Sequence, residues 1–471
     1  IMTYPSNNFK KIFTKKQLNE LFNKEFSTST TTGRDRINAE TFKKEIDIHI
    51  QNIIKKVNNS TYKFSIYKEK LILKGANKNP RIISIPSLRD RMVLKSLFTI
   101  LYESFDIQQP LPQQIIKRLI SSINNNTYHD FIKLDLNNFY GSIKHDLLMA
   151  SISHKIRSKK ILYLLNQALI TETLPLDIKS TKKNHRKIGI PQGLSISNLL
   201  AEIFLIDFDK WVEQQFPDSA YFRYVDDILL LCPRGKAIEY SDEIINKLSG
   251  KTYQLSVHPL EGNSTKSNLG ELNDGFEFLG YRYINSKFSV RKASINKLEN
   301  SIAKLCTALK YKKRALEEAY REDEAGFHNA YNFELQKFKW KLNLKITGCI
   351  YNNKRYGWIF YFSQLTDTKI LYLLDGIVRN ILIRFGLDTL QIAPKSFLKA
   401  HEIIQRSTRP NKYIPNFDLV KEDVVKIRNE LLNLFDEEFL INKTDNEIIY
   451  LFKKIINKHT SDIESDLGAI S

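Results

Sequence analysis

The sequence predicts an α+β fold, with an antiparallel sheet in its first part and an all-α region in its last part. Two observations favour this class. Short runs rich in β-branched and aromatic residues, bounded by Gly, Pro or Asn, occur up to about residue 290 and are typical of strands. From about Ala293 onward, apolar residues recur at helical spacing without another strand-rich block.

Helices and strands are expected to alternate along the first part of the chain. Residues 15–58 show helical spacing and predict a helical lead-in. Strands are expected in "YKFSIYKEKLILKG" and "PRIISIP", and a helix in "RDRMVLKSLFTILYESF". The run "DFIKLDL" predicts a strand with Asp135 near its end, and an amphipathic helix follows "GIPQG". "YFRYVDDILLL", Tyr221–Leu231, predicts a hairpin.

The composition favours a polyanionic partner and gives no sign of a membrane span. The 471 residues carry a net charge of +20 and 42% hydrophobic residues, enough for a sizeable core. We find neither a long uncharged apolar run nor a signal-peptide core, so we expect a cytoplasmic protein without a membrane partner. Cys232, Cys306 and Cys349 are widely spaced, which argues against a zinc site or a disulfide framework.

Two adjacent carboxylates, Asp226 and Asp227, interrupt the apolar hairpin run. Buried carboxylates repel each other and are costly to ionise unless a cation compensates them. If the sheet places Asp135 beside the hairpin tip, three carboxylates meet, and oxygen ligands without His or Cys suit Mg²⁺ or Mn²⁺. This set predicts two-metal phosphoryl transfer, with Asp135 and Asp226 holding both ions and Asp227 supporting. The alternative is a tight turn that carries Asp because Asp is a common turn residue.

Five segments, in order, resemble the motifs of reverse transcriptases. They are "NKNPRIISIPSLRDRMV", "FIKLDLNNFYGSI", "GIPQGLSISNLLAEI", "YFRYVDDILLL" with its Y-x-D-D box, and "GFEFLGY". The resemblance implies a right-hand polymerase fold with fingers, palm and thumb, an antiparallel palm sheet and a C-terminal all-α region. It also implies an RNA-directed DNA polymerase, a nucleotidyltransferase that takes dNTPs, copies an RNA template and makes a DNA product.

On this resemblance we expect four domains. Residues 1–60 form the N-terminal helical lead-in and 61–292 the fingers and palm; 293–380 form the helical thumb and 381–471 a C-terminal helical extension.

The resemblance also assigns roles to individual residues. The catalytic and metal-binding residues are Asp135, Asp226 and Asp227, and the nucleotide-binding residues are Lys78, Arg81, Tyr140, Gln192, Gly193 and Lys266. Arg81 and Lys78 match the grip on the triphosphate, Tyr140 the aromatic residue that excludes a 2′-hydroxyl, and Lys266 a basic residue near the leaving pyrophosphate. A core aromatic for Tyr140 and a solvated loop lysine for Lys266 are the alternatives.

The thumb region narrows the resemblance within the family. "KWKLNLKITGCIYNNKRYGWIFYFSQLTD", Lys339–Asp367, resembles the defence-associated, abortive-infection-like "unknown group" of prokaryotic reverse transcriptases. That group implies an antiphage role and a non-coding RNA partner. We expect the basic, aromatic stretches Lys310–Arg314 and Asn352–Trp358 to bind RNA, and the C-terminal helices to mediate homo-oligomer contacts. A retron-type or group II intron-like enzyme, or template-independent DNA synthesis at the same site, stays an alternative.

Overall fold

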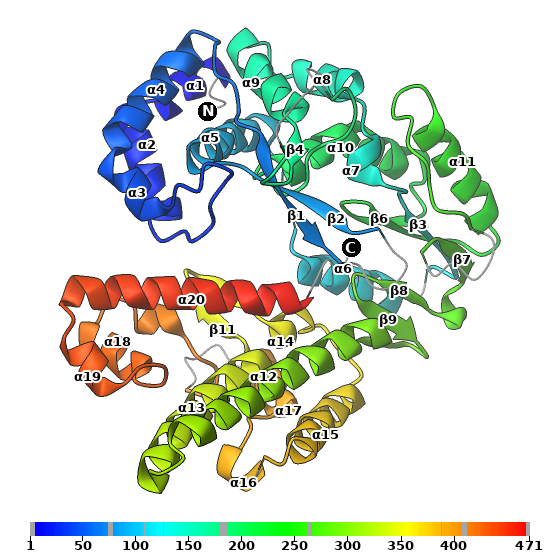
Figure 1. Cartoon of the computed structure of the whole chain (residues 1–471). Helices are drawn as coiled ribbons and strands as arrows, with labels where there is room; N and C mark the ends of the chain where they lie inside the picture. Colours follow the sequence, from blue (N-terminus) through cyan, green and yellow to red (C-terminus); the bar gives the residue numbers. More distant parts are fainter. Residues whose placement is uncertain are drawn as a thin grey trace. The chain divides into compact units, whose positions relative to one another are not determined.

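The chain forms two compact units (Figure 1). The computed structural model describes residues 5–73, 79–107, 110–125, 127–178, 186–260, 266–387, 389–406 and 412–467. Unit 1 comprises Ile1–Pro110 and Asn126–Gly270, and unit 2 comprises Leu111–Asn125 and Glu271–Ser471. The four-domain division expected from the sequence is finer than these two units and stays a prediction.

Unit 1 opens with the helical lead-in expected from the sequence. Its elements are α1 (Pro5–Ile12), α2 (Lys15–Leu21), the π-helix η1 (Phe22–Phe26), α3 (Ala39–Lys44) and α4 (Ile46–Asn58). A small sheet of β2 (Arg81–Ile85), β1 (Tyr67–Ile72) and β4 (Thr173–Leu174) follows. Then comes α5 (Leu88–Phe105), capped by the Ser87 side chain, which accepts a hydrogen bond from Asp90 N.

The central sheet of unit 1 has four strands in the order β5-β6-β3-β7. They are β5 (Ala220–Tyr224), β6 (Asp227–Cys232), β3 (Asp130–Asp135) and β7 (Asn268–Glu271). β6 lies between β5 and β3, antiparallel to both. Every residue of β6, and all but the last of β3, is buried, so these two strands are covered on both faces, as the apolar run 228–232 of β6 requires.

Helices enclose this sheet and build the core of unit 1. They are α7 (Phe139–Ser142), α8 (His145–Ser153), α9 (Lys159–Ile170), α10 (Ser197–Gln215) and α11 (Ala237–Ser249). Leu97 of α5, Leu165 of α9 and Phe204 of α10 are buried in one cluster with Leu230 of β6. Burial of this continuous apolar surface is the main force that fixes β3 and β6 in register.

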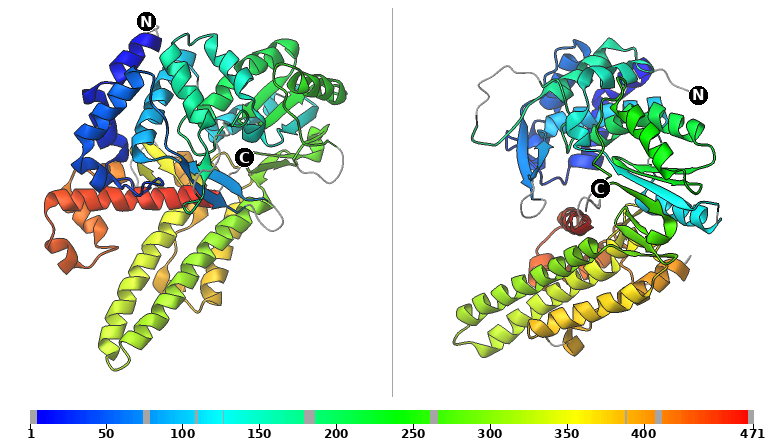
Figure 2. Two further views of the ribbon diagram at one scale, coloured as in Figure 1. Left: turned by 45° about the horizontal axis from the view of Figure 1, so that its top comes forward. Right: turned by 90° about the vertical axis from the view of Figure 1, so that its right-hand side faces the viewer.

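Unit 2 is helical apart from two small β elements. β8 (Phe276–Phe278), β9 (Tyr281–Ile284) and β10 (Lys287–Val290) form an antiparallel sheet, and β11 (Cys349–Tyr351) pairs with β12 (Lys354–Tyr356). The helices are α6 (Pro112–Asn124), α12 (Lys292–Ala319), α13 (Glu324–Thr347), α14 (Trp358–Tyr361), α15 (Lys369–Arg384), α16 (Thr389–Ile392), α17 (Phe397–Arg406), the 3₁₀ turn η3 (Phe417–Leu419), α18 (Val424–Leu431), α19 (Glu437–Ile441) and α20 (Asp445–Leu467). Figures 1 and 2 show α12 and α13 side by side as a long pair.

The β11–β12 hairpin differs from the all-helical expectation for this region. Asn352 and Asn353 have φ of 51° and 58°, and two residues with positive φ make the two-residue turn whose twist suits a hairpin. Asp418 accepts hydrogen bonds from both of their backbone N–H groups, at 2.7 and 2.8 Å. Apolar periodicity did not reveal the hairpin because its strands are only three residues long.

Among the residues that the structure describes, no helix has the length and apolar character needed to cross a membrane.

The tip of the β5–β6 hairpin has a strained backbone. Only Val225 and Asp226 join the two strands, because Tyr224 pairs with Asp227. Val225 has φ of 58°, in the left-handed region that β-branched residues rarely enter because of steric crowding at Cβ. Such a conformation persists only where contacts with neighbouring residues stabilise it enough to offset the strain.

A buried ion-pair network supplies those contacts. Arg223 Nη1 donates to the Val225 carbonyl oxygen at 3.0 Å, and Nη2 and Nε donate to Glu202 and Asp209 of α10, each at 2.7 Å. Burial alone would lower the pKa of the Arg223 guanidinium, but the two carboxylates outweigh it and raise the pKa above its usual range. The network therefore ties the hairpin tip to α10.

We expect Arg223→Met to lower the free energy of unfolding by about 3–5 kcal/mol, because the buried guanidinium is lost and Glu202 and Asp209, whose side chains are only 19% and 27% exposed, would be left without their cation. Urea denaturation followed by circular dichroism measures the change. Arg282→Met, which removes the same atoms from an exposed strand position, is the matched control and should change stability by less than about 0.5 kcal/mol. Equal effects of the two substitutions would show that the Arg223 network does not stabilise the hairpin tip.

Candidate active site

Asp135 ends β3 directly opposite Asp227, the first residue of β6. Asp226 lies in the two-residue turn, directly before Asp227. The carbonyl oxygen of Asp226 accepts a hydrogen bond from Leu136 N at 3.1 Å. The sequence suggested that both adjacent carboxylates lie at the hairpin tip. The turn is shorter than that: Asp226 lies in it, whereas Asp227 belongs to the strand and is only 8% exposed.

The carboxylates of Asp135 and Asp226 are electrostatically coupled. Burial, and next the negative charge of Asp135, raise the pKa of Asp226 to about 6. The positive charges of Arg81 and Lys266 oppose the shift without cancelling it. At neutral pH the nearby positive charges therefore do not fully compensate the negative charge of these two carboxylates.

Two side-chain nitrogen groups from the segment between α11 and β7 contact Asp135. Lys266 Nζ lies 3.3 Å and His258 Nε2 lies 3.4 Å from Asp135 Oδ1, and the two nitrogens are 3.0 Å apart. Burial and the Lys266 ammonium lower the pKa of His258 despite the nearby carboxylate, so the imidazole is neutral at pH 7. A neutral imidazole can accept a hydrogen bond from the ammonium, which leaves Lys266 as the cation on this carboxylate.

Backbone hydrogen bonds hold these groups around Asp135. His258 N donates to the Asp135 carbonyl oxygen at 2.9 Å, and Asp135 N donates to Ser267 Oγ at 3.0 Å. Asn137 N donates to the Ser256 carbonyl oxygen at 2.8 Å. Residues from two later segments thus fix the end of β3.

Tyr140 is fixed by contacts with the segment that opens α10. Its hydroxyl donates to Asn198 Oδ1 at 2.9 Å, and its carbonyl oxygen accepts from Ile190 N at 2.7 Å. Burial, with the charge of Asp226 as the next cause, raises the pKa of the Tyr140 phenol, so it stays neutral. The ring is therefore held in one orientation within electrostatic range of Asp226.

Gln192 and Gly193 lie in the turn before α10 and pack against β2. Ser84 N donates to the Gln192 carbonyl oxygen at 2.7 Å. Gly193 has φ of 102°, and a Cβ there would lie 2.7 Å from Ile83 Cγ2 and 2.9 Å from the Ser84 carbonyl oxygen. Only glycine suits this position, because both the conformation and the close approach exclude a side chain.

Arg81 is the first residue of β2 and is partly exposed. Its positive charge acts to lower the pKa of both Asp226 and Tyr140, so the guanidinium lies within electrostatic range of the carboxylates. Lys78, expected beside it, lies outside the described residues.

The arrangement fits a divalent cation held by few protein ligands. Among the described residues no group of three or more His, Cys, Asp or Glu side chains is placed to hold a metal. Mg²⁺ in polymerase-type sites needs only one or two carboxylates, with water and substrate phosphates completing its shell. Asp135 and Asp226 supply such oxygen donors, and the raised pKa of Asp226 marks the positive charge that they lack.

Sequence reasoning missed three residues that shape this site. Arg223 could have been found, since a charged residue inside an apolar strand is the same signal that marked the aspartates. Asn198 is one polar residue among several at the start of an amphipathic helix, and nothing in the sequence links it to Tyr140. His258 gave no signal because only the folded backbone brings it to Asp135.

Comparisons with known proteins show a family match and several relatives. The model of the family described as reverse transcriptase (RNA-dependent DNA polymerase) matches residues 41–283, just over half of the chain. Protein YkfC of Escherichia coli K12 is 23% identical over 302 residues, which cover 55% of this chain and 77% of YkfC. The group II intron-encoded protein LtrA of Lactococcus lactis is 27% identical over 176 residues, but the match spans only 28% of LtrA.

Solved structures of fungal telomerase are also similar. Telomerase of Candida albicans, in a complex with a fragment of telomeric RNA, is 15% identical with a TM-score of 0.38, covering 79% of this chain and 68% of that one. Apo telomerase of Candida tropicalis gives 15% identity and a TM-score of 0.37, covering 83% of this chain and 68% of that one.

The match to the family model covers the central sheet, the hairpin with its two aspartates and the turn before α10. It confirms the predicted fold class, an α+β right-hand polymerase fold, and the predicted enzyme class. The chain therefore belongs to the reverse transcriptase family and is an RNA-directed DNA polymerase.

Proposed function

We propose that this polymerase makes cDNA with Mg²⁺, or Mn²⁺, at Asp135 and Asp226, on a partner non-coding RNA and in antiphage defence. The observation that carries the site assignment is the register of β3 and β6 around the two-residue turn, which brings two coupled carboxylates together. Asp227 supports them from within β6. Two divalent cations held there would supply the chemistry: one would activate the primer 3′-hydroxyl, and the other would stabilise the pyrophosphate leaving group.

The remaining roles go to residues around this pair. Arg81 binds the triphosphate through its guanidinium fork, together with Lys78. Tyr140 closes the space beside the 2′ carbon of the sugar. Gln192 and Gly193 present backbone to the nascent base pair. Lys266, whose Nζ lies 3.3 Å from Asp135 Oδ1, would contact the leaving pyrophosphate.

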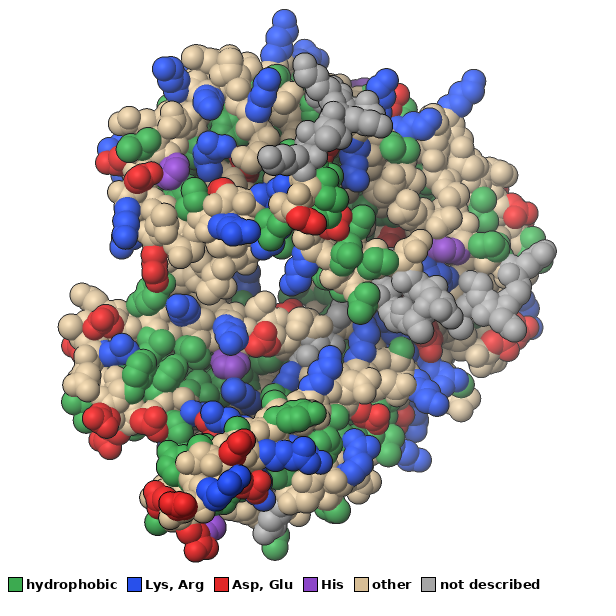
Figure 3. All heavy atoms as spheres, in the orientation of Figure 1, with side chains coloured by type: hydrophobic (Ala, Val, Ile, Leu, Met, Phe, Trp, Pro, Cys, Tyr) green, Lys and Arg blue, Asp and Glu red, His purple; other side chains and the backbone are tan. Residues whose placement is uncertain are grey.

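Unit 2 is assigned to holding the partner RNA. Lys310, Tyr311, Lys312, Lys313 and Arg314 are exposed on α12, and Lys and Arg side chains are visible along the α12–α13 pair in Figure 3. Exposed cations with an aromatic residue among them suit a phosphate backbone and unstacked bases. In the second expected stretch Trp358 is only 4% exposed and packs against Phe362, so its ring serves the core and is not available for stacking on a base.

Support for the biological role comes from the resemblance of residues 339–367 to defence-associated enzymes. A group II intron-like role is the second candidate, and the match to LtrA favours it. Homo-oligomer formation is supported by Tyr372, Leu373 and Ile383, which are 64%, 55% and 64% exposed on α15. Phage plaque assays in cells carrying active or inactive protein separate the two candidate roles.

We expect Asp226→Asn to abolish primer extension on an RNA template, because the substitution removes one of the two charged ligands. The metal-free variant should be more stable than the wild type at pH 8 by about 1–2 kcal/mol. The pKa of Asp226 is raised in the folded state, so its contribution to stability is present below its ordinary pKa and lost as the pH rises through about 6.

Extension assays with Mg²⁺ test the first expectation, and thermal melting in EDTA at pH 4 and pH 8 tests the second. Asp274→Asn, an exposed carboxylate in unit 2, is the control and should leave extension unchanged. Full extension by Asp226→Asn would remove Asp226 from the active site.

Tyr140→Ala should admit ribonucleotides, with a loss of discrimination on the order of 10- to 100-fold, because it empties the space beside the 2′ carbon. Tyr140→Phe should keep discrimination, since it loses only the hydrogen bond to Asn198. Single-nucleotide incorporation of rNTPs and dNTPs measures both. If the Ala variant discriminates as well as wild type, Tyr140 is a core residue and not the sugar gate.

Replacing Lys310, Lys312, Lys313 and Arg314 by Gln should weaken binding of the co-purifying RNA at least 10-fold and flatten its salt dependence. The matched control replaces Lys43, Lys44, Lys55 and Lys56, which are equally exposed on α3 and α4. RNA sequencing and filter binding across a salt series provide the measurement. Equal loss in both variants would mean that net charge, and not the α12 surface, binds the RNA.

A further inference from the structure

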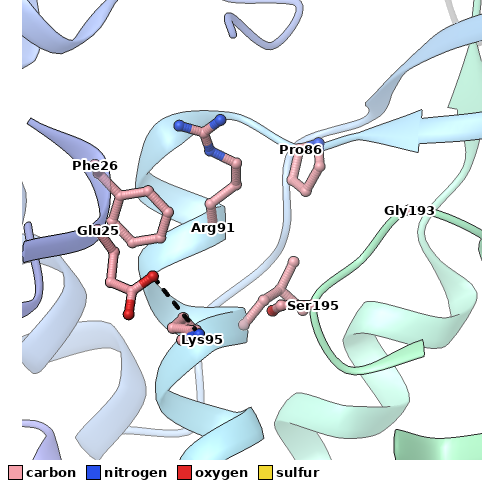
Figure 4. A pocket seen from close by; sticks show the side chains of 8 residues that line it. Glu25, Phe26, Pro86, Arg91, Lys95, Gly193 and Ser195 are labelled. Atoms are coloured by element: carbon pink, nitrogen blue, oxygen red, sulfur yellow. Dashed lines mark ion pairs between the residues drawn. The ribbon is translucent and has the colours of Figure 1, made fainter. Parts of the chain in front are cut away.

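Figure 4 shows a cavity of about 240 Å³ in unit 1, bounded by η1, by α5 and by the turn before α10. Arg91 lies over the Phe26 ring, 5.1 Å from its centroid, and Lys95 Nζ lies 3.7 Å from Glu25 Oε2. The two cations of this cavity therefore have partners within the chain. The cation at Asp135 is placed differently, because it contacts two groups that also bind metal ions in proteins.

His258 lies directly opposite Asp135 in a short pairing that continues β3. Leu136 forms an antiparallel bridge with Val257, so the residues beside them, Asp135 and His258, face each other across the two segments. The hydrogen bond from His258 N to the Asp135 carbonyl oxygen, at 2.9 Å, belongs to this register. Directly opposed residues carry their side chains on the same face. The backbone therefore holds the imidazole beside the carboxylate.

The hydrogen bonds of this cluster determine which nitrogen of His258 carries the proton. Lys266 Nζ lies 3.0 Å from His258 Nε2 and 3.3 Å from Asp135 Oδ1. An ammonium group only donates hydrogen bonds, so Nε2 is the acceptor, and this assigns the imidazole proton to Nδ1. The lone pair of Nε2 and the carboxylate oxygen of Asp135 are thus directed at the same cation.

The distance between these two donor atoms also suits a metal ion. His258 Nε2 and Asp135 Oδ1 lie 3.4 Å apart. Neighbouring ligands of one ion, at bond lengths of about 2.0–2.2 Å, lie roughly 2.8–3.6 Å from each other in octahedral or tetrahedral coordination. One ion can therefore bind both atoms without a change in the backbone.

Lys266 is the member of this cluster that can leave. Its side chain is 51% exposed, whereas those of His258 and Asp135 are 24% and 18% exposed. An ion pair with one partner so exposed contributes little to stability, so a divalent cation can replace the ammonium at small cost. The imidazole and the carboxylate stay in place, because a backbone hydrogen bond joins their residues.

We propose that His258 Nε2 is a nitrogen ligand of the divalent cation at Asp135, in place of the Lys266 ammonium. The inference rests on the proposed function, because it takes Asp135 to hold a metal ion. Mg²⁺ prefers oxygen ligands, whereas first-row transition ions such as Mn²⁺ also accept imidazole. His258 therefore shifts the metal preference of the site toward Mn²⁺.

The test is electron spin-echo spectroscopy of Mn²⁺ bound to the full chain without nucleotides or nucleic acid, because a directly bound nitrogen nucleus modulates the echo. The wild type should show ¹⁴N modulation, and a chain labelled with ¹⁵N-histidine should show the ¹⁵N pattern in its place. This comparison changes no residue, so it does not depend on how a variant folds.

His258→Gln should lose the histidine modulation and bind Mn²⁺ on the order of 10-fold more weakly, because one ligand is gone. Its affinity for Mg²⁺, measured by competition with Mn²⁺, should change by less than about 2-fold. The matched control is His154→Gln, which replaces an exposed histidine at the end of α8 and should change neither the spectrum nor the affinities.

A wild-type Mn²⁺ spectrum without histidine modulation would overturn the proposal, and so would modulation that persists in His258→Gln. Asp226→Asn separates this inference from the proposed function. If Asp226→Asn abolishes Mn²⁺ binding and the wild type shows no histidine modulation, the role of His258 is refuted and the active-site assignment stands. If His258 gives the modulation but Asp226→Asn leaves Mn²⁺ binding unchanged, this inference is supported and the assignment of Asp226 is refuted.

Discussion

The repulsion between two carboxylates held close together is the constraint on which the site depends. Asp135 ends β3 and Asp226 lies in the turn before β6, and a buried apolar core fixes the register of these two strands, so the backbone cannot move the two residues apart to relieve the repulsion. The protein offsets it only in part, through Arg81 and Lys266, and the pKa of Asp226 stays near 6. We propose that a bound divalent cation relieves this repulsion.

The strain in the hairpin tip follows from the placement of Asp226 beside Asp135. A two-residue turn places Asp226 beside the end of β3, and it forces Val225 into the left-handed region. Strain of this kind costs on the order of 1–3 kcal/mol. Arg223 offsets it by bonding the Val225 carbonyl oxygen while pairing with Glu202 and Asp209, so α10 positions the tip as well as covering the sheet.

The sequence was sufficient for the features that depend on local pattern. The strand ending at Asp135, the hairpin around Asp226 and the helix after Gly193 all follow from apolar periodicity and turn residues. The sequence did not predict that Asp226 lies in the turn whereas Asp227 belongs to the strand, because the length of the turn depends on the register between the two strands. Nor could it place His258 against Asp135 or Arg91 against Phe26, since those contacts join segments far apart in the chain.

Anomalous diffraction from a crystal of the chain soaked in Mn²⁺ tests the central claim most directly, because it locates the ion without relying on turnover. The account predicts a peak within bonding distance of the Asp135 and Asp226 carboxylates, with Lys266 Nζ displaced from Asp135, and no peak there in Asp226→Asn. A Mn²⁺ peak elsewhere in unit 1, with Lys266 still on Asp135 in the wild type, would contradict it.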